Sequence, residues 1–283
     1  MRLLITGADG MIGHGVWRYF SQTTDHDVVA SVRSARLLAS FGEKPVAQTG
    51  DLDDADAVSD LMDRVRPDWV INCAGVTKHA ESGDDAIKVI RANCLLPNLL
   101  ANATAPIGAR MIHISTDCVF LGTRGHYSET DVPDANDLYG RSKVLGEIAD
   151  RAHVLTIRTS TIGFELASQR GLLEWFLAQR GRCRGFSRAI FSGVTSHELG
   201  RVLNEYVLGR DDLSGILHLA GPAIDKLSLL RAMKAHFAAP VEIDEDSSLV
   251  IDRSLDGSRF CALTGFKPRG WNDMLSELAE IGR

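Results

Sequence analysis

Short apolar runs alternate along the chain with longer amphipathic segments. The apolar runs cover residues 3–5, 28–32, 69–71, 111–114, 154–158 and 215–219. Short runs that are apolar throughout are typical of parallel strands buried on both faces, whereas segments 54–65 and 84–100 have helical periodicity. The alternation of strand and helix predicts an α/β fold built on a doubly wound parallel sheet.

Two stretches depart from this alternation. Residues 160–188 are rich in Gly and Arg, and residues 223–283 read as mostly helical with short breaks. We interpret them as a smaller interleaved lobe over the carboxyl ends of the strands, while a helix at 196–208 and the strand at 215–219 return to the main sheet. The predicted division is a larger domain of residues 1–160 plus about 191–221, and a smaller lobe of about 161–190 plus 222–283.

Composition is that of an ordinary globular protein, with 283 residues, 45% hydrophobic and 24% charged. The net charge of -6 does not favour a nucleic-acid partner. The five cysteines form no CxxC or Cys/His cluster, so we expect no metal site and a reducing compartment. Because the start shows no signal-peptide pattern and no apolar stretch suffices for a membrane span, we expect a cytoplasmic protein without a membrane partner.

A glycine-rich turn follows the first predicted strand. The sequence TGADGMIG at residues 6–13 places Gly7, Gly10 and Gly13 in a GxxGxxG pattern that opens a helix. Glycines let the backbone approach a pyrophosphate, and the amides of Met11, Ile12 and their neighbours then face the phosphates. The pattern predicts a Rossmann-type dinucleotide site in the larger domain; the alternative is a tight strand–helix turn without a ligand.

Further candidate cofactor residues follow the next strands. Arg33 and Ser34 end the second strand, where an NAD site usually carries an acidic residue, so we expect NADP(H) to be preferred and NAD(H) to be possible. Asp51 and Leu52 are candidates for the adenine, although Asp51 is equally suited to cap the next helix. Small residues, Cys73-Ala74-Gly75, end the fourth strand and allow close approach of the cofactor.

The candidate catalytic residues lie in two motifs. Ser115-Thr116-Asp117 ends the strand at 111–114, and Tyr139 and Lys143 are four residues apart in a predicted helix that Asn136 or Asp137 would cap. Reduction of a carbonyl needs a proton donor, and we expect the lysine ammonium to lower the tyrosine pKa and to bind the ribose of the cofactor together with Ser115 and Tyr139. Thr116 would hydrogen-bond the carbonyl oxygen.

These motifs together resemble the extended short-chain dehydrogenases/reductases, and within them the dTDP-4-dehydrorhamnose reductase family of sugar-nucleotide reductases. The resemblance rests on TGADGMIG (6–13), STDCVF (115–120), YGRSKVLGE (139–147) and RTS (158–160), and more loosely on VTSHEL (194–199) and DRSLD (252–256). It implies NAD(P)H-dependent reduction of a 4-keto sugar on a nucleotide, in polysaccharide precursor synthesis. Our further candidates for substrate contacts are Lys78, Asp117, Val119 and Thr159.

The chain departs from this family at several positions. Cys118 stands where the family has Tyr, Thr161 where it often has Trp, and residues 76–81 read VTKHAE. These positions bear on the identity of the sugar and the nucleotide. An arginine cluster that includes Arg182 and Arg184 is our candidate for the substrate diphosphate, with a solvated basic face as the alternative.

Other functions remain open on the sequence alone. One is a nucleotide-sugar epimerase or dehydratase of the same fold, but a dehydratase would want a Glu after Asp117, where this chain has Cys118. Another is an NADP-binding regulatory subunit without turnover, against which the intact Thr116, Tyr139 and Lys143 argue. A homodimer is one option for the assembly.

Overall fold

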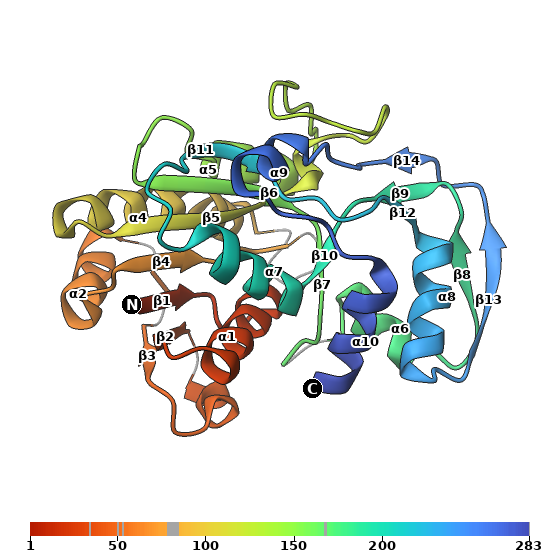
Figure 1. Ribbon diagram of the computed structural model, residues 1–283, viewed down its shortest axis with the longest axis horizontal. Coiled ribbons are helices and arrows are strands. Elements are labelled where there is room, and N and C mark those ends of the chain that lie inside the picture. Colours follow the sequence, from red (N-terminus) through yellow and green to blue (C-terminus); the bar gives the residue numbers. More distant parts are fainter. Residues whose placement is uncertain (34, 50, 53, 78–84, 167–168, 283) are drawn as a thin grey trace.

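The computed structural model describes residues 1–33, 35–49, 51–52, 54–77, 85–166 and 169–282. A parallel sheet with strand order β3-β2-β1-β4-β5-β6-β11 forms its centre (Figure 1). All six predicted apolar runs lie in this sheet, which confirms the doubly wound α/β fold. Its strands are β1 (Arg2–Thr6), β2 (Asp27–Val32), β3 (Val46–Gln48), β4 (Trp69–Asn72), β5 (Arg110–Thr116), β6 (Val154–Thr159) and β11 (Gly215–His218).

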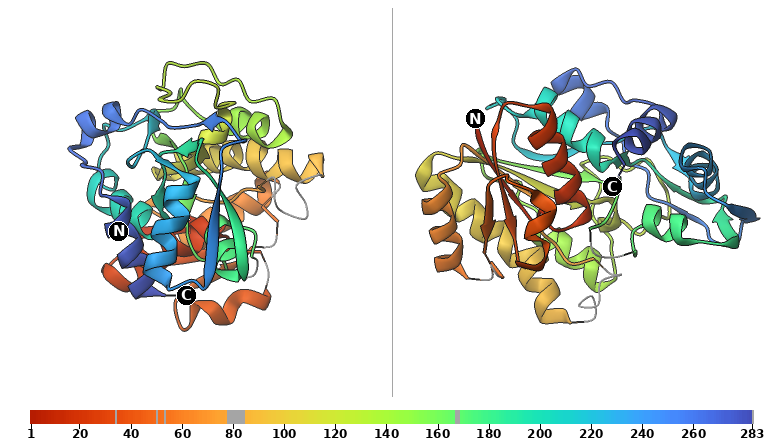
Figure 2. Two further views of the ribbon diagram at one scale, coloured as in Figure 1. Left: turned by 90° about the vertical axis from the view of Figure 1, so that its right-hand side faces the viewer. Right: turned by 90° about the horizontal axis from the view of Figure 1, so that it is seen from below.

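Helices cover both faces of the sheet, as the view from below shows (Figure 2). One face packs against α1 (Met11–Thr23), α7 (Ser196–Val202) and the π-helical segment η5 (Leu203–Val207), and the other against α2 (Ala55–Val65), α4 (Leu96–Thr104) and α5 (Leu138–Gly146). The helix expected at 84–100 consists of three pieces, because α3 (Ala86–Ile90) and the π-helical segment η2 (Arg91–Leu95) precede α4. Because the strand order reverses between β1 and β4, a cleft opens beyond their carboxyl ends.

The smaller lobe lies beyond those ends, at the right of Figure 1. Two short ladders, β8 with β13 and β9 with β12 and β14, form its strands. Its elements are α6 (Leu172–Ala178), β8 (Gly181–Phe186), β9 (Ala189–Phe191), β12 (Ile224–Asp225), α8 (Lys226–Phe237), β13 (Val241–Asp246), β14 (Ile251–Asp252) and α10 (Trp271–Ile281). No helix in the described part of the chain is long and apolar enough to cross a membrane.

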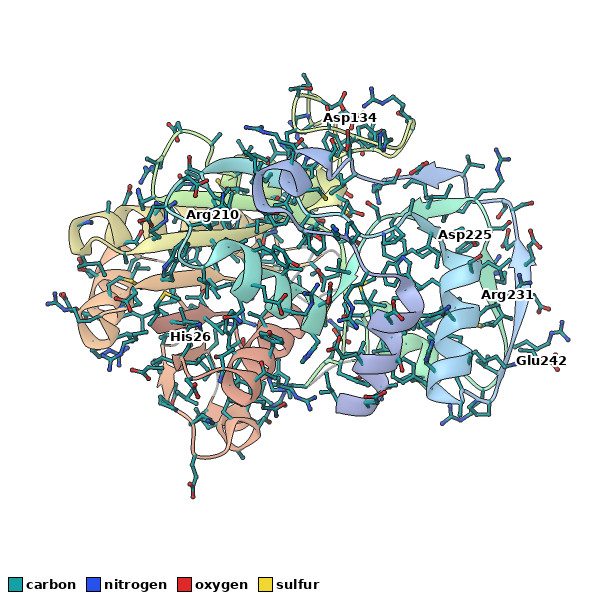
Figure 3. The ribbon with its side chains drawn as sticks, in the orientation of Figure 1. His26, Asp134, Arg210, Asp225, Arg231 and Glu242 are labelled. Carbon is teal, nitrogen blue, oxygen red and sulfur yellow. The ribbon has the colours of Figure 1, made fainter. Side chains whose placement is uncertain are left out.

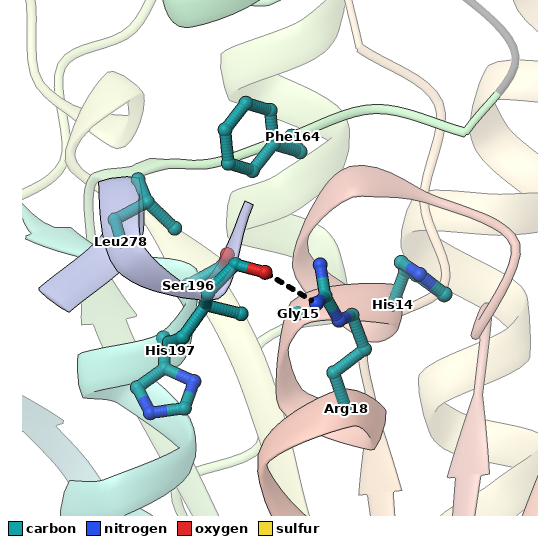
Figure 4. A pocket seen from close by; sticks show the side chains of 8 residues that line it. His14, Gly15, Arg18, Phe164, Ser196, His197 and Leu278 are labelled. Atoms are coloured by element: carbon teal, nitrogen blue, oxygen red, sulfur yellow. Dashed lines mark hydrogen bonds between the residues drawn. The ribbon is translucent and has the colours of Figure 1, made fainter. Parts of the chain in front are cut away.

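Several connections join the lobe to the main sheet. The short pair β7 (Thr161–Ile162) and β10 (Val194–Thr195) lies at the junction, and α9 (Ser258–Thr264) packs beside β11. The Arg18 guanidinium of α1 donates to the carbonyl oxygens of Ile281 (3.1 Å) and Gly282 (2.6 Å), at the end of α10. A small cavity between α1, α7 and α10 adjoins this contact (Figure 4). The lobe is therefore anchored directly to the glycine-turn helix.

Candidate active site

The glycine turn is built by close backbone contacts. Gly7 has a φ of 69°, and a Cβ there would lie 2.6 Å from the Ala74 backbone. A Cβ on Gly13 would lie 2.2 Å from the Gly7 carbonyl oxygen, so α1 can begin this close to β1 only with glycine. Helix α1 starts at Met11 without a side-chain cap on Gly10. The first amides of the helix, including those of Met11, Ile12 and Gly13, are thus available to an anion.

A cavity of about 620 Å³ opens in front of this turn. Among the expected cofactor residues, those that line it are Gly7, Gly10, Arg33, Asp51, Leu52, Cys73, Ala74 and Gly75. Ser34 lies outside the described residues. Asp51 does not cap α2, since the Asp54 side chain accepts the Ala57 amide at 2.7 Å. Arg33 lies at 3.9 Å from both Asp9 and Asp51, and Arg36 also lines the cavity, which the sequence did not lead us to expect.

Buried amides shape the strand ends behind the cavity. Asn72 accepts from the Thr6 hydroxyl at 2.8 Å and lies 3.0 Å from His113 Nδ1, which ties β1, β4 and β5 together. Asn93, fully buried in η2, exchanges hydrogen bonds with the backbone of Val76 at 2.8 and 2.9 Å. Asn93 therefore fixes the loop that carries Gly75, a role that an isolated polar residue in a helical pattern does not reveal.

The expected catalytic residues converge at the end of β5. Helix α5 begins beside it, with Asp137 accepting the Gly140 amide at 2.7 Å as its N-cap, one of the two caps we predicted. Lys143 is 5% exposed and its Nζ donates to the Ile114 carbonyl at 2.8 Å. Tyr139, one turn earlier, interacts with the Thr116 hydroxyl. Thr116 also donates to Asp117 at 3.2 Å.

The ionisation of the two helix residues follows from their burial. Burial raises the pKa of Tyr139, and the Thr116 hydroxyl only partly opposes this by hydrogen bonding. Burial lowers the pKa of Lys143 to about 8, although Glu147 opposes the change. We expected Lys143 to lower the tyrosine pKa; in the structure desolvation outweighs any such effect, so Tyr139 is a neutral phenol at neutral pH.

Ser115 belongs to a buried hydrogen-bonded group at the end of β5. Its hydroxyl donates to Glu147 at 2.7 Å, and Glu147 in turn pairs with Arg158 through bonds of 2.7 and 2.8 Å. Both charged side chains are less than 5% exposed. Arg158 also lies 3.3 Å from His218. Successive side chains on a strand point to opposite faces, so Ser115 and Thr116 point to different sides of β5, and a contact of Ser115 with the cofactor stays a prediction.

Two cations of the smaller lobe act on a carboxylate at the end of β5. Asp117 is 5% exposed; burial raises its pKa, and the charges of Lys226 and Arg253 oppose this rise. Arg253 donates to the Phe120 carbonyl at 2.8 Å and approaches the Cys118 sulfur at 3.7 Å. Thr159 pairs in register with Thr116 on the neighbouring strand. These residues therefore surround the expected catalytic end of β5.

Other expected substrate residues lie elsewhere. Val119 is fully buried in an apolar cluster, so its side chain is not available to a ligand. Arg182 and Arg184 point outward from β8 and form ion pairs with Glu242, Asp244 and Asp246 of β13. Glu242 marks this outer edge at the far right of Figure 3. Strand pairing places the arginines opposite these carboxylates and away from the cleft, and Lys78 lies outside the described residues.

Comparisons with known proteins identify the relatives of this chain. Residues 1–174 match the family model described as the RmlD substrate binding domain. A dTDP-4-dehydrorhamnose reductase from Burkholderia thailandensis is 31% identical over 77% of this chain and 72% of its own length. A crystal structure described as a hypothetical dTDP-4-dehydrorhamnose reductase from Sulfolobus tokodaii is 28% identical, with a TM-score of 0.78 over 96% of this chain and 98% of its own.

The chain also resembles a protein that is not described as a reductase. The methionine adenosyltransferase 2 subunit beta of Mus musculus is 36% identical over 150 residues, which cover 52% of this chain and only 42% of the mouse protein. The chain thus matches less than half the length of this relative. The matching family model and the Burkholderia reductase together establish that the chain belongs to the RmlD substrate-binding-domain family of extended short-chain dehydrogenases/reductases.

Proposed function

We propose that the protein catalyses NADPH-dependent reduction of a 4-keto group on a nucleotide-linked deoxysugar, as a step in polysaccharide precursor synthesis. The observation that carries the proposal is the convergence of Thr116, Tyr139 and Lys143 at the end of β5, beside the cavity at the glycine turn. The similarity to the Burkholderia reductase supports the reaction class.

The cavity fits a dinucleotide. The uncapped N-terminus of α1 would hold the pyrophosphate, and the small residues Cys73 to Gly75 would leave room for the rest of the cofactor. Arg33 and Arg36 on the same wall suit the 2′-phosphate of NADP(H). NADH lacks this phosphate, so we propose that it is accepted less well.

The chain's own residues then supply the acid chemistry. The bound dinucleotide supplies the two electrons as a hydride. Tyr139, held neutral by burial, donates its phenolic proton to the carbonyl oxygen, so that the C=O group, with the hydride on its carbon, becomes a CH–OH group. Thr116 hydrogen-bonds the same oxygen and orients it, and Lys143 holds a positive charge that stabilises the resulting tyrosinate.

The substrate diphosphate needs a cationic surface, and Arg182 and Arg184 do not face the cleft. We assign this role to Lys226 and Arg253, which bring two positive charges from the smaller lobe to one buried carboxylate, Asp117. Arg253 is already oriented by its bond to the Phe120 carbonyl. An arginine fixed in this way is suited to forked contacts with phosphate oxygens.

The test is loss of NADPH absorbance with a panel of dTDP- and UDP-linked 4-keto sugars. Turnover of at least one of them is expected, and Tyr139→Phe should lower kcat by about 10²–10⁴-fold while leaving NADPH affinity intact. Arg253→Ala should raise KM for the sugar nucleotide, whereas Arg182→Ala should not. A Tyr139→Phe variant that retains the wild-type rate would show that Tyr139 is not the acid.

The likeness to the adenosyltransferase subunit favours a second candidate, a cofactor-binding regulatory subunit. This candidate predicts NADPH binding without turnover of any sugar in the panel. An epimerase is separated from a reductase by its product, since it would return the cofactor in its starting redox state.

We also propose that the protein is a cytoplasmic homodimer. None of its five cysteines is part of a disulfide, which suits a reducing compartment. Four large apolar side chains on the adjacent helices α3, η2 and α5 are exposed: Ile87, Ile90, Leu95 and Leu145. Isologous packing of two copies would cover them. Light scattering should give twice the chain mass, and Leu145→Lys should give the mass of one chain.

A further inference from the structure

Glu147 follows the proposed catalytic lysine by four residues and is the C-cap of helix α5. Its two carboxylate oxygens accept three hydrogen bonds, one from the Ser115 hydroxyl and two from the Arg158 guanidinium, at 2.7 to 2.8 Å. The side chain is 4% exposed. A buried carboxylate with this many partners has a fixed orientation.

The bonds of Glu147 and Lys143 end on neighbouring residues of β5. Lys143 Nζ binds the Ile114 carbonyl, and Glu147 binds the Ser115 side chain. The next residue is Thr116. Lys143 in α5 and Glu147 at its C-cap therefore both bind the end of β5. We infer that a change at Glu147 affects both Lys143 and Thr116.

Glu147 supplies the negative charge that acts on the Lys143 ammonium, because the other titratable groups near this lysine are neutral. Cys73 of the loop after β4 faces the ammonium, but burial raises the pKa of its thiol to about 12, so it is neutral. Burial likewise lowers the pKa of His113 on β5 and raises that of Tyr139, so both are neutral at pH 7. Among these described groups Glu147 alone brings a negative charge to Lys143, and it shares that charge with Arg158.

We propose that Glu147 is a positioning residue that keeps Lys143 protonated and fixes the end of β5. This inference rests on the proposed reductase function for its catalytic meaning, but the coupling between Glu147 and Lys143 is a property of the fold alone. The motif that defines the site is then YxxxKxxxE, completed by an arginine on β6.

The coupling can be measured without substrate. The Lys143 pKa is followed by NMR in protein labelled with ¹³C at the lysine side chains, and Lys143→Arg assigns the signal. We expect Glu147→Gln to lower the Lys143 pKa by about one unit or more, because an opposite charge at close range has been removed. An unchanged pKa overturns the proposal.

A matched control is available elsewhere in the fold. Glu198 is fully buried and pairs with Arg201 and Arg269 on α7 and the segment before α10. Glu198→Gln should destabilise the protein comparably but leave the Lys143 pKa unchanged, which separates a specific coupling from a general loss of stability. If Glu147→Gln does not fold, Arg158→Gln tests the same coupling with the opposite sign, since loss of the competing cation should raise the Lys143 pKa.

Activity then tests the catalytic meaning separately. If the wild type reduces a sugar nucleotide, the alkaline limb of its kcat profile should move to lower pH in Glu147→Gln, by the same amount as the lysine pKa. If the wild type reduces none of the panel, the proposed function fails while the NMR result still decides the coupling. A kcat limb that stays in place while the lysine pKa moves would show that Lys143 does not govern turnover.

Discussion

Positively charged side chains lie at both ends of the proposed cleft. At the cofactor end, Arg33 is mostly exposed and lies within 4 Å of two carboxylates, so its guanidinium is positioned without being neutralised by a buried partner. At the proposed substrate end, the charges of Lys226 and Arg253 act on the buried Asp117. Arginine at the first of these positions suits a 2′-phosphate better than a 2′-hydroxyl.

Arg33→Ala should therefore weaken NADPH binding by about 1.5–3 kcal/mol, the size of a hydrogen bond to a charged group. The affinity for NADH should change much less, because NADH has no phosphate at that position. Fluorescence titration with both cofactors measures this, and Arg33→Lys, which keeps the charge but not the fork, should be intermediate. Equal losses for both cofactors would assign Arg33 a structural role.

Local motifs could be read from the sequence at this scale, but partners distant in the chain could not. The spacing of Tyr139 and Lys143 alone places them on one helix face, and the glycine pattern alone indicates the turn. Glu147 is paired by Arg158 and Ser115, and Arg253 reaches Asp117 across more than a hundred residues. The segments that carry the family resemblance include these charged residues, but local spacing does not show which partners they bind.

Among the elements, helix α5 contains two of the three proposed catalytic residues. Its nine residues include Tyr139 and Lys143, and its first turn depends on the Asp137 cap. The element that the sequence concealed most completely is the β8–β13 ladder, in which Arg182 and Arg184 alternate with Cys183 and Gly185. Arginine does not by itself indicate a strand. The acidic residues of β13 that pair with these arginines lie about 60 residues later in the chain.

Asp137→Ala should unwind the start of α5 and destabilise the protein by about 1 kcal/mol, the usual cost of a lost N-cap. Because Tyr139 lies in that first turn, kcat should fall more than KM changes. Urea unfolding and steady-state kinetics check the two effects. Asp137→Asn retains a capping oxygen and should keep most of the stability and most of kcat. If Asp137→Asn loses as much as Asp137→Ala, loss of the N-cap does not explain the effect.

Across the whole molecule, the contact of α1 with α7 and α10 joins the lobes. His14 of α1 and His197 of α7 lie beside the small cavity there, with Arg18 reaching the end of α10 (Figure 4). Burial lowers the pKa of His14 to about 4 and also lowers that of His197. Both imidazoles are therefore neutral in the folded protein at pH 7.

This predicts an acid-sensitive junction. The unfolded chain binds a proton at His14 near pH 6.5, whereas the folded protein does so only near pH 4, so stability is lost as the pH falls between these values. The loss due to His14 is at most about 3 kcal/mol. Unfolding free energies at pH 7 and pH 4.5 should differ less in His14→Gln than in the wild type. His126→Asn, at an exposed histidine, is the control and should retain the wild-type difference.

The place of β11 at one end of the sheet has a consequence for fragments of the chain. Residues 215–218 pair with β6, and α7 packs so closely on α1 that a Cβ on Gly15 would lie 2.1 Å from the Ser196 hydroxyl. A fragment trimmed to the matched residues 1–174 would therefore expose an unpaired apolar strand edge and the inner side of α1. Such edges template intermolecular pairing, so we expect a fragment of residues 1–174 to aggregate when expressed alone.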